Sequence, residues 1–482
     1  MILGEQVLRS RISVLCQDEL QQIHSATLEI LETIGAIVNS PQALSILEEN
    51  GAFVDRSRRL VKIPSNLVKE AIRSAPKGIT LCGRNPARDI ELENGKINFG
   101  MGSTTVHIID PHTWKRETAR KEHIAQAVRV ADALPNIGFV EQFCCALDCP
   151  RSVQDLHEIE AVLTNTEKPI VAIAYSSKGA KNFLRMASLV SGSIDELRRR
   201  PILAVYAEPV SPLQHDEEAT NILIEVSKQG IPVLYGSAVQ SAATGPITLA
   251  GTLVTANAEV LVGLVLSQLV RKGTPFIHGV ISTIIDARSG VMCYGAPEFA
   301  LINIMAAQLT QWYGLPFFGT GGTTDSKTVD EQAVCEAMMT ALPAALAGTN
   351  LIHDMGYIES GLTGSFEMLV IGNEIADMCK RIARGVTVND ETLAVDVIRD
   401  AGPGGHFLSK KHTLEHIDEH WMPKLIDRNT YEAWKKSGSR DMVIKARETV
   451  AKLLKEHNPE PLPKNIIQGM DQIIKDSARS TR

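Results

Sequence analysis

The chain of 482 residues lacks the features that mark several classes of protein. Its formal net charge is -7, which indicates no basic surface for nucleic acid. No apolar run approaches a transmembrane span, and the first residues show no secretory signal pattern. Eight cysteines without a regular spacing fit a reducing compartment. We therefore expect a soluble cytoplasmic protein with no nucleic-acid or membrane partner.

The familiar catalytic motifs are also missing. We find no G-x-G-x-x-G after the first predicted strand, no G-x-S-x-G, no H-E-x-x-H and no Walker loop. Cys144, Cys145 and Cys149 follow a short apolar run, but adjacent side chains on a strand point to opposite faces. The sequence therefore predicts buried cysteines, no metal bound by this chain and no specific acid–base pair.

What the chain does have is a regular alternation of apolar runs with amphipathic helices, beginning near residue 121. The runs are continuously apolar, as parallel strands covered on both faces are. Seven such units of about 30 residues favour a TIM (β/α)8 barrel over an open sheet, although the eighth strand is not located. The runs are Ile137–Val140, Pro169–Tyr175, Ile202–Tyr206, Ile231–Tyr235, Pro275–His278, Leu315–Phe318 and Thr349–His353.

Three parts of the chain differ in character. Residues 1–120 are predicted to form an N-terminal extension of helices and short strands, with strands near Ile79–Cys82 and Ile97–Gly100. Residues 121–385 are predicted to form the barrel core. Residues 386–482 are charged and helical, and this C-terminal extension could cap the barrel, mediate oligomerisation or form plain surface. A homo-oligomer is expected.

Aromatic residues make up 5% of the chain, yet tyrosines end three consecutive predicted strands. They are Tyr175, Tyr206 and Tyr235, and Glu208 follows the second of them. The carboxyl ends of barrel strands surround the reaction space. An aromatic face attracts a cation by about 0.5–2 kcal/mol, and a carboxylate adds to the attraction. The tyrosines therefore suggest a cage for a quaternary ammonium; alternatively, each one only bridges core and solvent.

Other polar residues follow the later strands. His278 and His353 could each donate a hydrogen bond to a substrate carboxylate, although a lone histidine after an apolar run more often has a structural role. The His353 position is the stronger candidate, because Asp354 and Tyr357 follow it in the sequence. Phe318 ends the preceding strand and could complete the aromatic cage.

A loop rich in glycine and threonine follows Phe318. Gly319, Gly321 and Gly322 leave the backbone bare, so a large flat ligand could approach closely. Asp325 and Lys327 precede a helix that begins near Val329, and they could contact a partner; capping of that helix by Asp325 is the alternative. A flexible connection and a phosphate-binding loop are the other interpretations of this segment.

Several passages resemble the trimethylamine methyltransferase family of corrinoid-dependent methyltransferases, and the similarity extends over almost the full chain. The family implies a TIM barrel whose mouth meets a separate corrinoid protein, and transfer of an N-methyl group to Co(I). The matching passages are Leu28–Gly35, Glu208–Leu213, Gly295–Glu298, the Gly319–Lys327 loop and Trp421–Arg428.

One departure from the family bears on the substrate. Archaeal trimethylamine enzymes of the family contain pyrrolysine, whereas this chain has only the standard twenty residues. It is therefore similar to the branch that includes glycine betaine methyltransferase. A quaternary ammonium already carries the charge that makes a neutral amine leave, so covalent activation is unnecessary, and the enzyme must only position the methyl group and exclude water.

The resemblance implies an arrangement of substrate and partner. The trimethylammonium group of glycine betaine is expected among the predicted cage residues, its carboxylate near His353 and Tyr357, and the partner's corrinoid over Gly319–Gly322. The same chemistry on proline betaine, carnitine, butyrobetaine or a tertiary methylamine remains an alternative. So do a phosphate-binding barrel enzyme and a non-catalytic betaine-binding protein. The expected cage residues are Tyr175, Tyr206, Tyr235 and Phe318, with Glu208 nearby.

Overall fold

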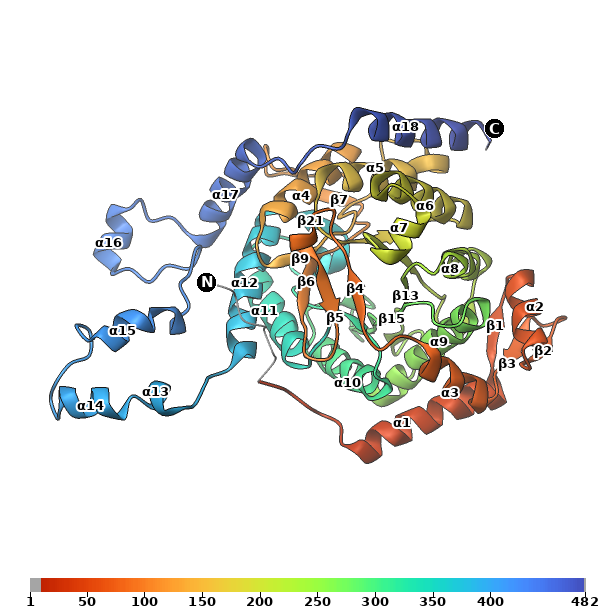
Figure 1. The fold of residues 1–482 in the computed structure, drawn as a ribbon, viewed down its shortest axis with the longest axis horizontal. Coiled ribbons are helices and arrows are strands. Elements are labelled where there is room, and N and C mark those ends of the chain that lie inside the picture. Colours follow the sequence, from red (N-terminus) through yellow and green to blue (C-terminus); the bar gives the residue numbers. More distant parts are fainter. Residues whose placement is uncertain (1–9, 481–482) are drawn as a thin grey trace.

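The computed structural model describes residues 10–480, and its core is a sheet of eight parallel strands (Figure 1). A bridge between Val140 and Ile170 joins the two ends of this sheet, so the strands close into a barrel. The predicted TIM barrel and its seven located strands are confirmed. In order around the barrel the strands are β10 (Ile170–Ile173), β11 (Leu203–Ala207), β13 (Val233–Ser237), β15 (Phe276–Val280), β18 (Phe317–Thr320), β19 (Leu351–Met355), β6 (Asn98–Met101) and β9 (Ile137–Phe139).

The eighth strand, β6, lies before residue 121, between β19 and β9. The predicted start of the barrel at residue 121 is therefore wrong, because it leaves out strand β6. The other predicted boundaries along the chain remain predictions. The sequence predicts a strand at Ile97–Gly100, but this strand precedes the regular strand–helix alternation, and only its pairing with β19 and β9 places it in the barrel. A Cβ at Gly100 would lie 2.3 Å from the Phe139 ring, so the glycine makes room for that ring inside the barrel.

Helices cover the outside of the barrel, and their ends follow from local sequence. The N-caps Ser176, Asp216, Asp330 and Ser365 each accept a hydrogen bond from a first-turn amide. The covering helices are α4 (Lys121–Ala133), α5 (Gln154–Asn165), α6 (Ser177–Ser191), α7 (Ile194–Arg199), α8 (Glu217–Gln229), α9 (Leu249–Val270), α10 (Pro297–Tyr313), α11 (Glu331–Leu346) and α12 (Phe366–Arg384).

Helix α9 corrects one statement about the sequence. With 22 residues and a hydropathy of 1.8, it is long and apolar enough to cross a membrane by composition alone. In the structure 83% of its apolar window is buried, and its polar residues bond within the protein. Asn257 donates to Thr27 and Tyr313, and Glu259 accepts from Ser237. Helix α9 therefore belongs to the layer of helices around the barrel, and it is buried there by its neighbours.

One end of the barrel is closed by a hairpin of β4 (Ile79–Leu81) and β5 (Ile90–Leu92), which crosses its centre in Figure 1. The first and last residues of each hairpin strand point into the barrel. They belong to one buried cluster with inward-facing residues of the barrel strands, such as Val171 and Leu234. Water is thus excluded from this end, and only the carboxyl ends of the strands can admit a ligand.

Smaller elements surround the barrel. The N-terminal part contains α1 (Gln17–Glu29), a π-helical turn (Ile30–Ile34), α2 (Pro41–Glu49), α3 (Ser65–Ser74) and a sheet of β1 (Ala36–Val38), β2 (Phe53–Asp55), β3 (Leu60–Lys62) and β12 (Gln214–His215). The carboxyl-end loops carry β7 (His107–Ile109), β8 (Arg116–Thr118), β20 (Tyr357–Ile358) and β21 (Thr363–Ser365) in one sheet, and β14 (Gln240–Ser241), β16 (Thr283–Ile285) and β17 (Met292–Cys293) in another.

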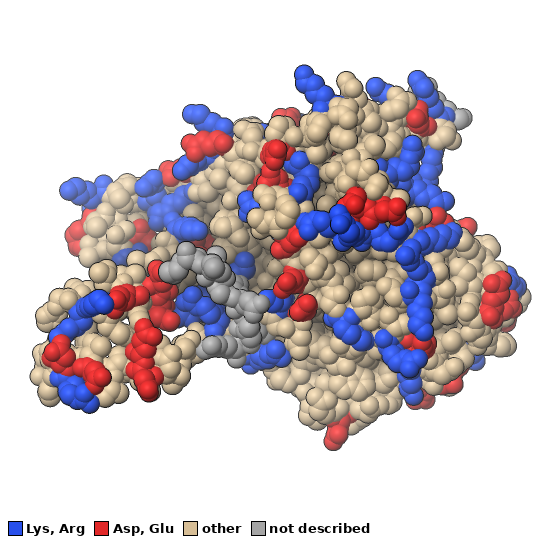
Figure 2. Space-filling view, viewed as in Figure 1, with Lys and Arg blue, Asp and Glu red and all other residues tan. Residues whose placement is uncertain are grey.

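The C-terminal part is helical, as predicted, and two of its helices pack on the barrel layer. Helix α17 lies on α12 and α4, and α18 lies on α6. Positive and negative side chains are interspersed over the face shown in Figure 2. The helices are α13 (Asp390–Leu393), α14 (Val395–Ala401), α15 (Lys411–Glu415), α16 (Tyr431–Lys436), α17 (Met442–Glu456) and α18 (Lys464–Arg479).

Candidate active site

The alternation of side chains along the strands decides which predicted site residues face the barrel interior. On β11, Tyr206 belongs to the interior cluster with Phe318, and the two ring centroids are 6.1 Å apart. The Tyr206 ring passes over Gly236 of β13, where a Cβ would lie 2.7 Å from it. The tyrosine hydroxyl donates to Glu208 at 2.6 Å. Tyr206, Glu208 and Phe318 therefore meet at the open end of the barrel.

A second group of residues joins them from β19 and the loop that follows. His353 stacks on Phe318 with centroids 4.0 Å apart, and its Nε2 lies 2.8 Å from the Thr320 hydroxyl. Its Nδ1 lies 2.7 Å from Asp354 Oδ1 and 3.9 Å from Glu141 Oε1. Because His353 is buried, these contacts hold its ring in one orientation.

A bulge brings both His353 and Asp354 to the interior, although neighbours on a regular strand face opposite sides. The register between β19 and β6 shifts between Ile352 and Met355, and Asp354 has a φ of 81°. This left-handed conformation costs a non-glycine residue on the order of 1 kcal/mol or more. Gly102 leaves room for two side chains beside the bulge, because a Cβ there would lie 2.6 Å from Asp354 Oδ1 and 2.3 Å from the Tyr357 ring.

Two tyrosines complete the group. Burial and the nearby charges of Asp354 and Glu141 raise the pKa of Tyr357 well above its usual value. Burial, Asp354 and Glu208 likewise raise the pKa of Tyr294, which lies between β17 and α10. We call the eight residues that interact in this way the mouth cluster: Glu141, Tyr206, Glu208, Tyr294, Phe318, His353, Asp354 and Tyr357.

The mouth cluster is strongly acidic. Burial, and then the charge of Asp354, raise the pKa of Glu141 well above its usual value. Burial also raises the pKa of Glu208, although its side chain is accessible to solvent. Glu208 is therefore a carboxyl group that the protein partly desolvates and that solvent can still reach. Within residues 10–480, no lysine or arginine is among the groups that shift the pKa of Glu141 or Glu208.

Uncompensated carboxyl groups beside aromatic rings favour one kind of ligand. A cation bound beside Glu141 and Glu208 would favour the ionised form of both carboxyl groups, and the tyrosine faces would attract it. An anion such as phosphate would meet like charge instead. The arrangement can therefore hold a small cation beside the aromatic rings.

Two of the predicted cage residues lie elsewhere. Tyr235 faces outward, where it packs against Gly263 of α9 and its hydroxyl lies 2.7 Å from His215 Nδ1. The prediction that it faces the substrate is therefore wrong, because Leu234 takes the inward position on β13. Tyr175 is 40% exposed, and its hydroxyl donates to Glu158 of α5 at 2.9 Å. Its ring makes no contact with the aromatic rings of the mouth cluster in the described residues.

His278 has a structural role. Its Nε2 lies 3.0 Å from Asn257 Oδ1 of α9, and burial lowers its pKa to about 3. The cysteines at the end of β9 are also structural. Cys144 and Cys145 are buried, and burial raises the pKa of Cys145 to about 11, so the thiol stays protonated. No group of metal ligands is assembled in residues 10–480.

The loop after β18 is packed rather than open. Gly321 and Gly322 are buried, and Cβ atoms there would lie 2.9 Å from Ile352 and 2.4 Å from Met355. A Cβ at Gly319 would lie 2.7 Å from Asn303. Close packing thus accounts for these three glycines without an approaching ligand. Lys327 is exposed, and its Nζ donates to the backbone of Asp325.

The backbone amides of this loop already have acceptors. Gly321 donates to the His353 carbonyl, Gly322 to Thr340 Oγ1, and the Asp325 amide to Glu336. A phosphate would have to displace these bonds, so the phosphate-binding interpretation has no support here.

Asp325 connects three loops, and it is not the helix cap. Its Oδ1 accepts from the Tyr294 amide at 2.7 Å and from Ser360 Oγ at 2.7 Å, and its Oδ2 accepts from the Gly295 amide at 2.9 Å. The cap of α11 is Asp330. Asp325 therefore fixes the backbone that carries Tyr294 into the mouth cluster.

Replacing Asp325 by asparagine is expected to raise KM for the ligand of the mouth cluster about tenfold, with a smaller change in kcat. An amide nitrogen cannot accept a hydrogen bond, so one buried donor loses its partner at a cost of about 1–3 kcal/mol and Tyr294 shifts. Steady-state kinetics of the variant would test this. Asp330→Ala is the matched control, because losing the cap lowers the melting temperature without moving Tyr294. An unchanged KM in Asp325→Asn would show that Asp325 does not position this ring.

Sequence reasoning missed three residues of the cluster. Glu141 follows β9 in a segment where the three cysteines are the more conspicuous residues. Asp354 was noticed only as a neighbour of His353, because the bulge cannot be read from alternation. Tyr294 comes from a long loop whose path depends on Asp325. Among these, only Glu141 had a usable signal, as an acidic residue directly after a barrel strand.

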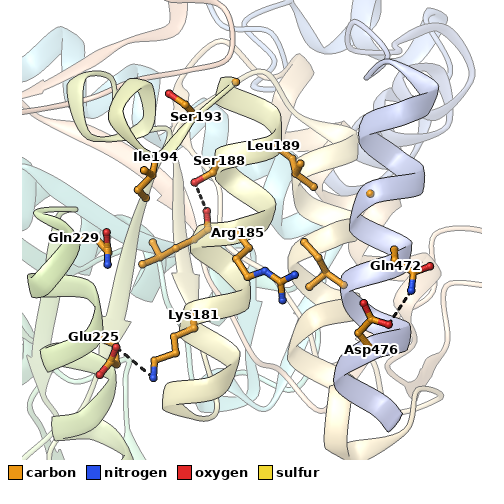
Figure 3. A pocket seen from close by; sticks show the side chains of 14 residues that line it. Lys181, Arg185, Ser188, Leu189, Ser193, Ile194, Glu225, Gln229, Gln472 and Asp476 are labelled. Carbon is orange, nitrogen blue, oxygen red and sulfur yellow. Dashed lines mark hydrogen bonds and ion pairs between the residues drawn. The ribbon is translucent and has the colours of Figure 1, made fainter. Parts of the chain in front are cut away.

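A cavity of about 730 Å³ lies away from the mouth cluster, on the outside of the barrel between α6, α7, α8 and α18 (Figure 3). Lys181 and Glu225 form an ion pair of 3.4 Å along one side, and Arg185 extends toward α18. No strand-end residue contributes to the described lining. This cavity is therefore not where a substrate would meet the mouth cluster.

Comparisons with known proteins agree with the fold and the resemblance. A family model described as trimethylamine methyltransferase (MTTB) matches residues 5–481. The trimethylamine methyltransferase MttB of Desulfitobacterium hafniense is 41% identical over 463 residues, which cover 95% of this chain and 93% of that protein. A glycine betaine methyltransferase of the same species is 34% identical over 431 residues, covering 88% and 89%.

A solved structure supports the architecture. The monomethylamine methyltransferase MtmB of Methanosarcina barkeri aligns over 98% of this chain and 89% of its own, with a TM-score of 0.54 and 11% identity. At that identity the likeness shows the fold alone.

Proposed function

Because this chain belongs to the trimethylamine methyltransferase family and is a corrinoid-dependent methyltransferase, we propose that its methyl donor is a quaternary amine bound as a cation at the mouth cluster. The observation that carries the proposal is the set of acidic and aromatic side chains at the open end of the barrel, where no lysine or arginine of the described residues acts on Glu141 or Glu208. The methyl acceptor is the Co(I) corrinoid of a separate partner protein, and both act in the cytoplasm.

The chain's own residues would perform binding, orientation and exclusion of water. Tyr206, Tyr294 and Tyr357 present ring faces to the ammonium, and Glu208 and Glu141 balance its charge. The positive nitrogen is the leaving group, so the amine departs neutral and no proton has to be supplied. The chain then has two tasks: it holds one methyl group toward the mouth of the barrel, and it keeps that group away from bulk water.

For the partner, we propose that the rim near Lys327 meets the corrinoid protein. Lys327 is the exposed member of the predicted corrinoid mouth, whereas Gly319, Gly321 and Gly322 are buried and support the rim from behind. In this proposal the loop contacts the partner through the exposed side chain of Lys327, and not through the glycine backbone.

Glycine betaine is the first candidate donor. Its carboxylate would lie on the His353 side, where the buried Nδ1 has no hydrogen-bond partner of good geometry in the described residues. A second candidate, a methylated amine without a carboxylate, is favoured by a specific observation: the three carboxyl groups of the cluster would repel a donor carboxylate. Trimethylamine and tetramethylammonium represent this class.

The test is to mix the purified chain with reduced free cobalamin and each donor, and to follow the absorbance of methylcobalamin. Glycine betaine, proline betaine, carnitine, butyrobetaine, trimethylamine and tetramethylammonium form the panel. We expect methylation with glycine betaine. Faster methylation with tetramethylammonium would select the second candidate, and activity with trimethylamine alone would disprove the quaternary-amine proposal.

A further inference from the structure

Helix α9 carries one charged residue, Glu259, in a sequence that is otherwise apolar or neutral. The side chain of Glu259 is fully buried. Moving a carboxylate out of water is costly unless hydrogen bonds replace the lost water. A glutamate at this position therefore destabilises the layer of helices around the barrel, unless the hydrogen bonds that it accepts offset the cost of its burial.

Glu259 joins two segments at the carboxyl ends of neighbouring barrel strands. Its Oε2 accepts from the Ser237 hydroxyl, at the end of β13, at 2.6 Å. The same oxygen accepts from the Ser211 hydroxyl at 2.9 Å, and Oε1 accepts from the Leu213 amide at 2.8 Å. Ser211 and Leu213 belong to the loop that follows Glu208, so Glu259 fixes this loop to helix α9.

The N-terminal sheet holds the same loop from another side. Strand β12 pairs with β1 in parallel, which places Gln214 beside Ile37. The Leu213 carbonyl accepts from the Ile37 amide at 2.9 Å. Val210 and Gln214 exchange two backbone hydrogen bonds of 2.7 and 3.1 Å. The loop after Glu208 is therefore fixed both to the N-terminal sheet and to α9.

The position of this loop matters because Glu208 has little other support. Among the described residues, the Tyr206 hydroxyl is the one group that donates to the Glu208 carboxylate, at 2.6 Å. The attraction between two charges falls with their distance. The place at which the backbone holds Glu208 therefore decides how strongly its charge acts on a cation at the mouth cluster.

We propose that Glu259 is a positioning residue of the methyl donor site, which holds the loop after β11 so that Glu208 faces the bound ammonium. This inference rests on the proposed function, because it assumes a cationic donor at the mouth cluster. Glu259 is fully buried and its oxygens are occupied by three donors of the protein, so it acts through the loop and does not touch the donor.

The charge of Glu259 also acts on Glu208. Burial raises the pKa of Glu208, the hydrogen bond from Tyr206 lowers it, and the charge of Glu259 raises it. Tyr235 and Tyr294 also interact with Glu208, and both stay neutral because burial raises the pKa of each. Within residues 10–480, no lysine or arginine is among the groups that shift the pKa of Glu259. Without the charge of Glu259, Glu208 should therefore ionise at a lower pH.

The test compares two substitutions of Glu259 by steady-state kinetics over a range of pH. Glu259→Ala removes all three hydrogen bonds and should raise KM for the donor about tenfold, with a smaller change in kcat. Glu259→Gln should restore a KM close to that of the wild type, because its amide can donate to the two serine oxygens and its carbonyl can accept from Leu213. The rise in donor affinity with pH should begin at a lower pH in Glu259→Gln, which a merely structural role would not produce.

Two further variants make the comparison robust. Ser211→Ala removes one hydrogen bond from the loop alone and should raise KM about threefold, so it tests the inference even where Glu259→Ala does not fold. Glu374→Ala is the matched control, because Glu374 of α12 is also buried and accepts from three backbone amides, but these belong to the C-terminal part. Glu374→Ala should lower the melting temperature and leave KM unchanged.

Hydrogen exchange of the ligand-free protein gives a readout that needs no donor. The Leu213 amide should exchange faster in Glu259→Ala than in Glu374→Ala. A wild-type protein that is active only with a donor other than a quaternary amine would disprove the proposed function. With an active quaternary amine, an unchanged KM in Glu259→Ala and Ser211→Ala would overturn the inference. So would unchanged exchange of Leu213, or a pH dependence in Glu259→Gln equal to that of the wild type.

Discussion

Replacing Glu208 by glutamine is expected to lower kcat/KM for a quaternary amine by about 100-fold, because the substitution removes a desolvated charge that faces the bound cation. The carboxyl group accepts from the Tyr206 hydroxyl at 2.6 Å, so glutamine can keep this contact while losing the charge. Methylcobalamin formation at varied donor concentration would measure the loss. Glu29→Gln, on the exposed face of α1, is the surface control and should change nothing.

The pH dependence of binding gives the same residue a second signature. Burial raises the pKa of Glu208 above the usual 4.5, and a bound cation favours the ionised form. Affinity for the donor should therefore increase as the pH rises above 4.5 and level off once the carboxyl groups are ionised. The slope should weaken in Glu208→Gln. The carbon isostere of glycine betaine, with a neutral quaternary carbon, should bind without this dependence; an equal dependence for both ligands would contradict the role of Glu208.

Replacing Tyr206 by leucine is expected to raise KM about 30-fold, because a desolvated ring face attracts a cation by about 2 kcal/mol and leucine retains only the apolar packing. Tyr206→Phe keeps the ring face and should cost far less, although Glu208 then loses a donor. Comparing the two variants by steady-state kinetics separates the ring from its hydroxyl.

Tyr175 and Tyr431 provide matched tyrosine controls. Tyr175 follows β10 in the same way that Tyr206 ends β11, but its hydroxyl donates to Glu158 of α5. Tyr431 is 65% exposed on α16. Tyr175→Leu and Tyr431→Ala should leave KM nearly unchanged. If Tyr175→Leu raised KM as much as Tyr206→Leu, the cage would extend to the residues predicted from sequence, and the mouth cluster would be incomplete.

By itself the sequence determined the class of fold and most of the chemical character of the site. Continuous apolar runs identified seven barrel strands, because a parallel strand that is covered on both faces needs apolar residues at nearly every position. The position of Tyr206, Phe318 and His353 at strand ends, with Glu208 and Tyr357 just after strand ends, then placed them near the open end of a barrel. These are local properties, which a residue's neighbours along the chain specify.

Tertiary structure alone decided which of these residues face one another. Tyr235 faces outward because Leu234 takes the inward position on β13. A shift of one residue in the strand register would reverse the two, and the composition of the strand does not distinguish these arrangements. The bulge at Asp354, the eighth strand β6 and the position of Tyr294 depend on contacts between segments far apart in sequence, such as the bonds from Asp325 to the Tyr294 and Gly295 amides. Strand composition and helix periodicity are local, whereas the shape and charge of a pocket arise where distant segments meet.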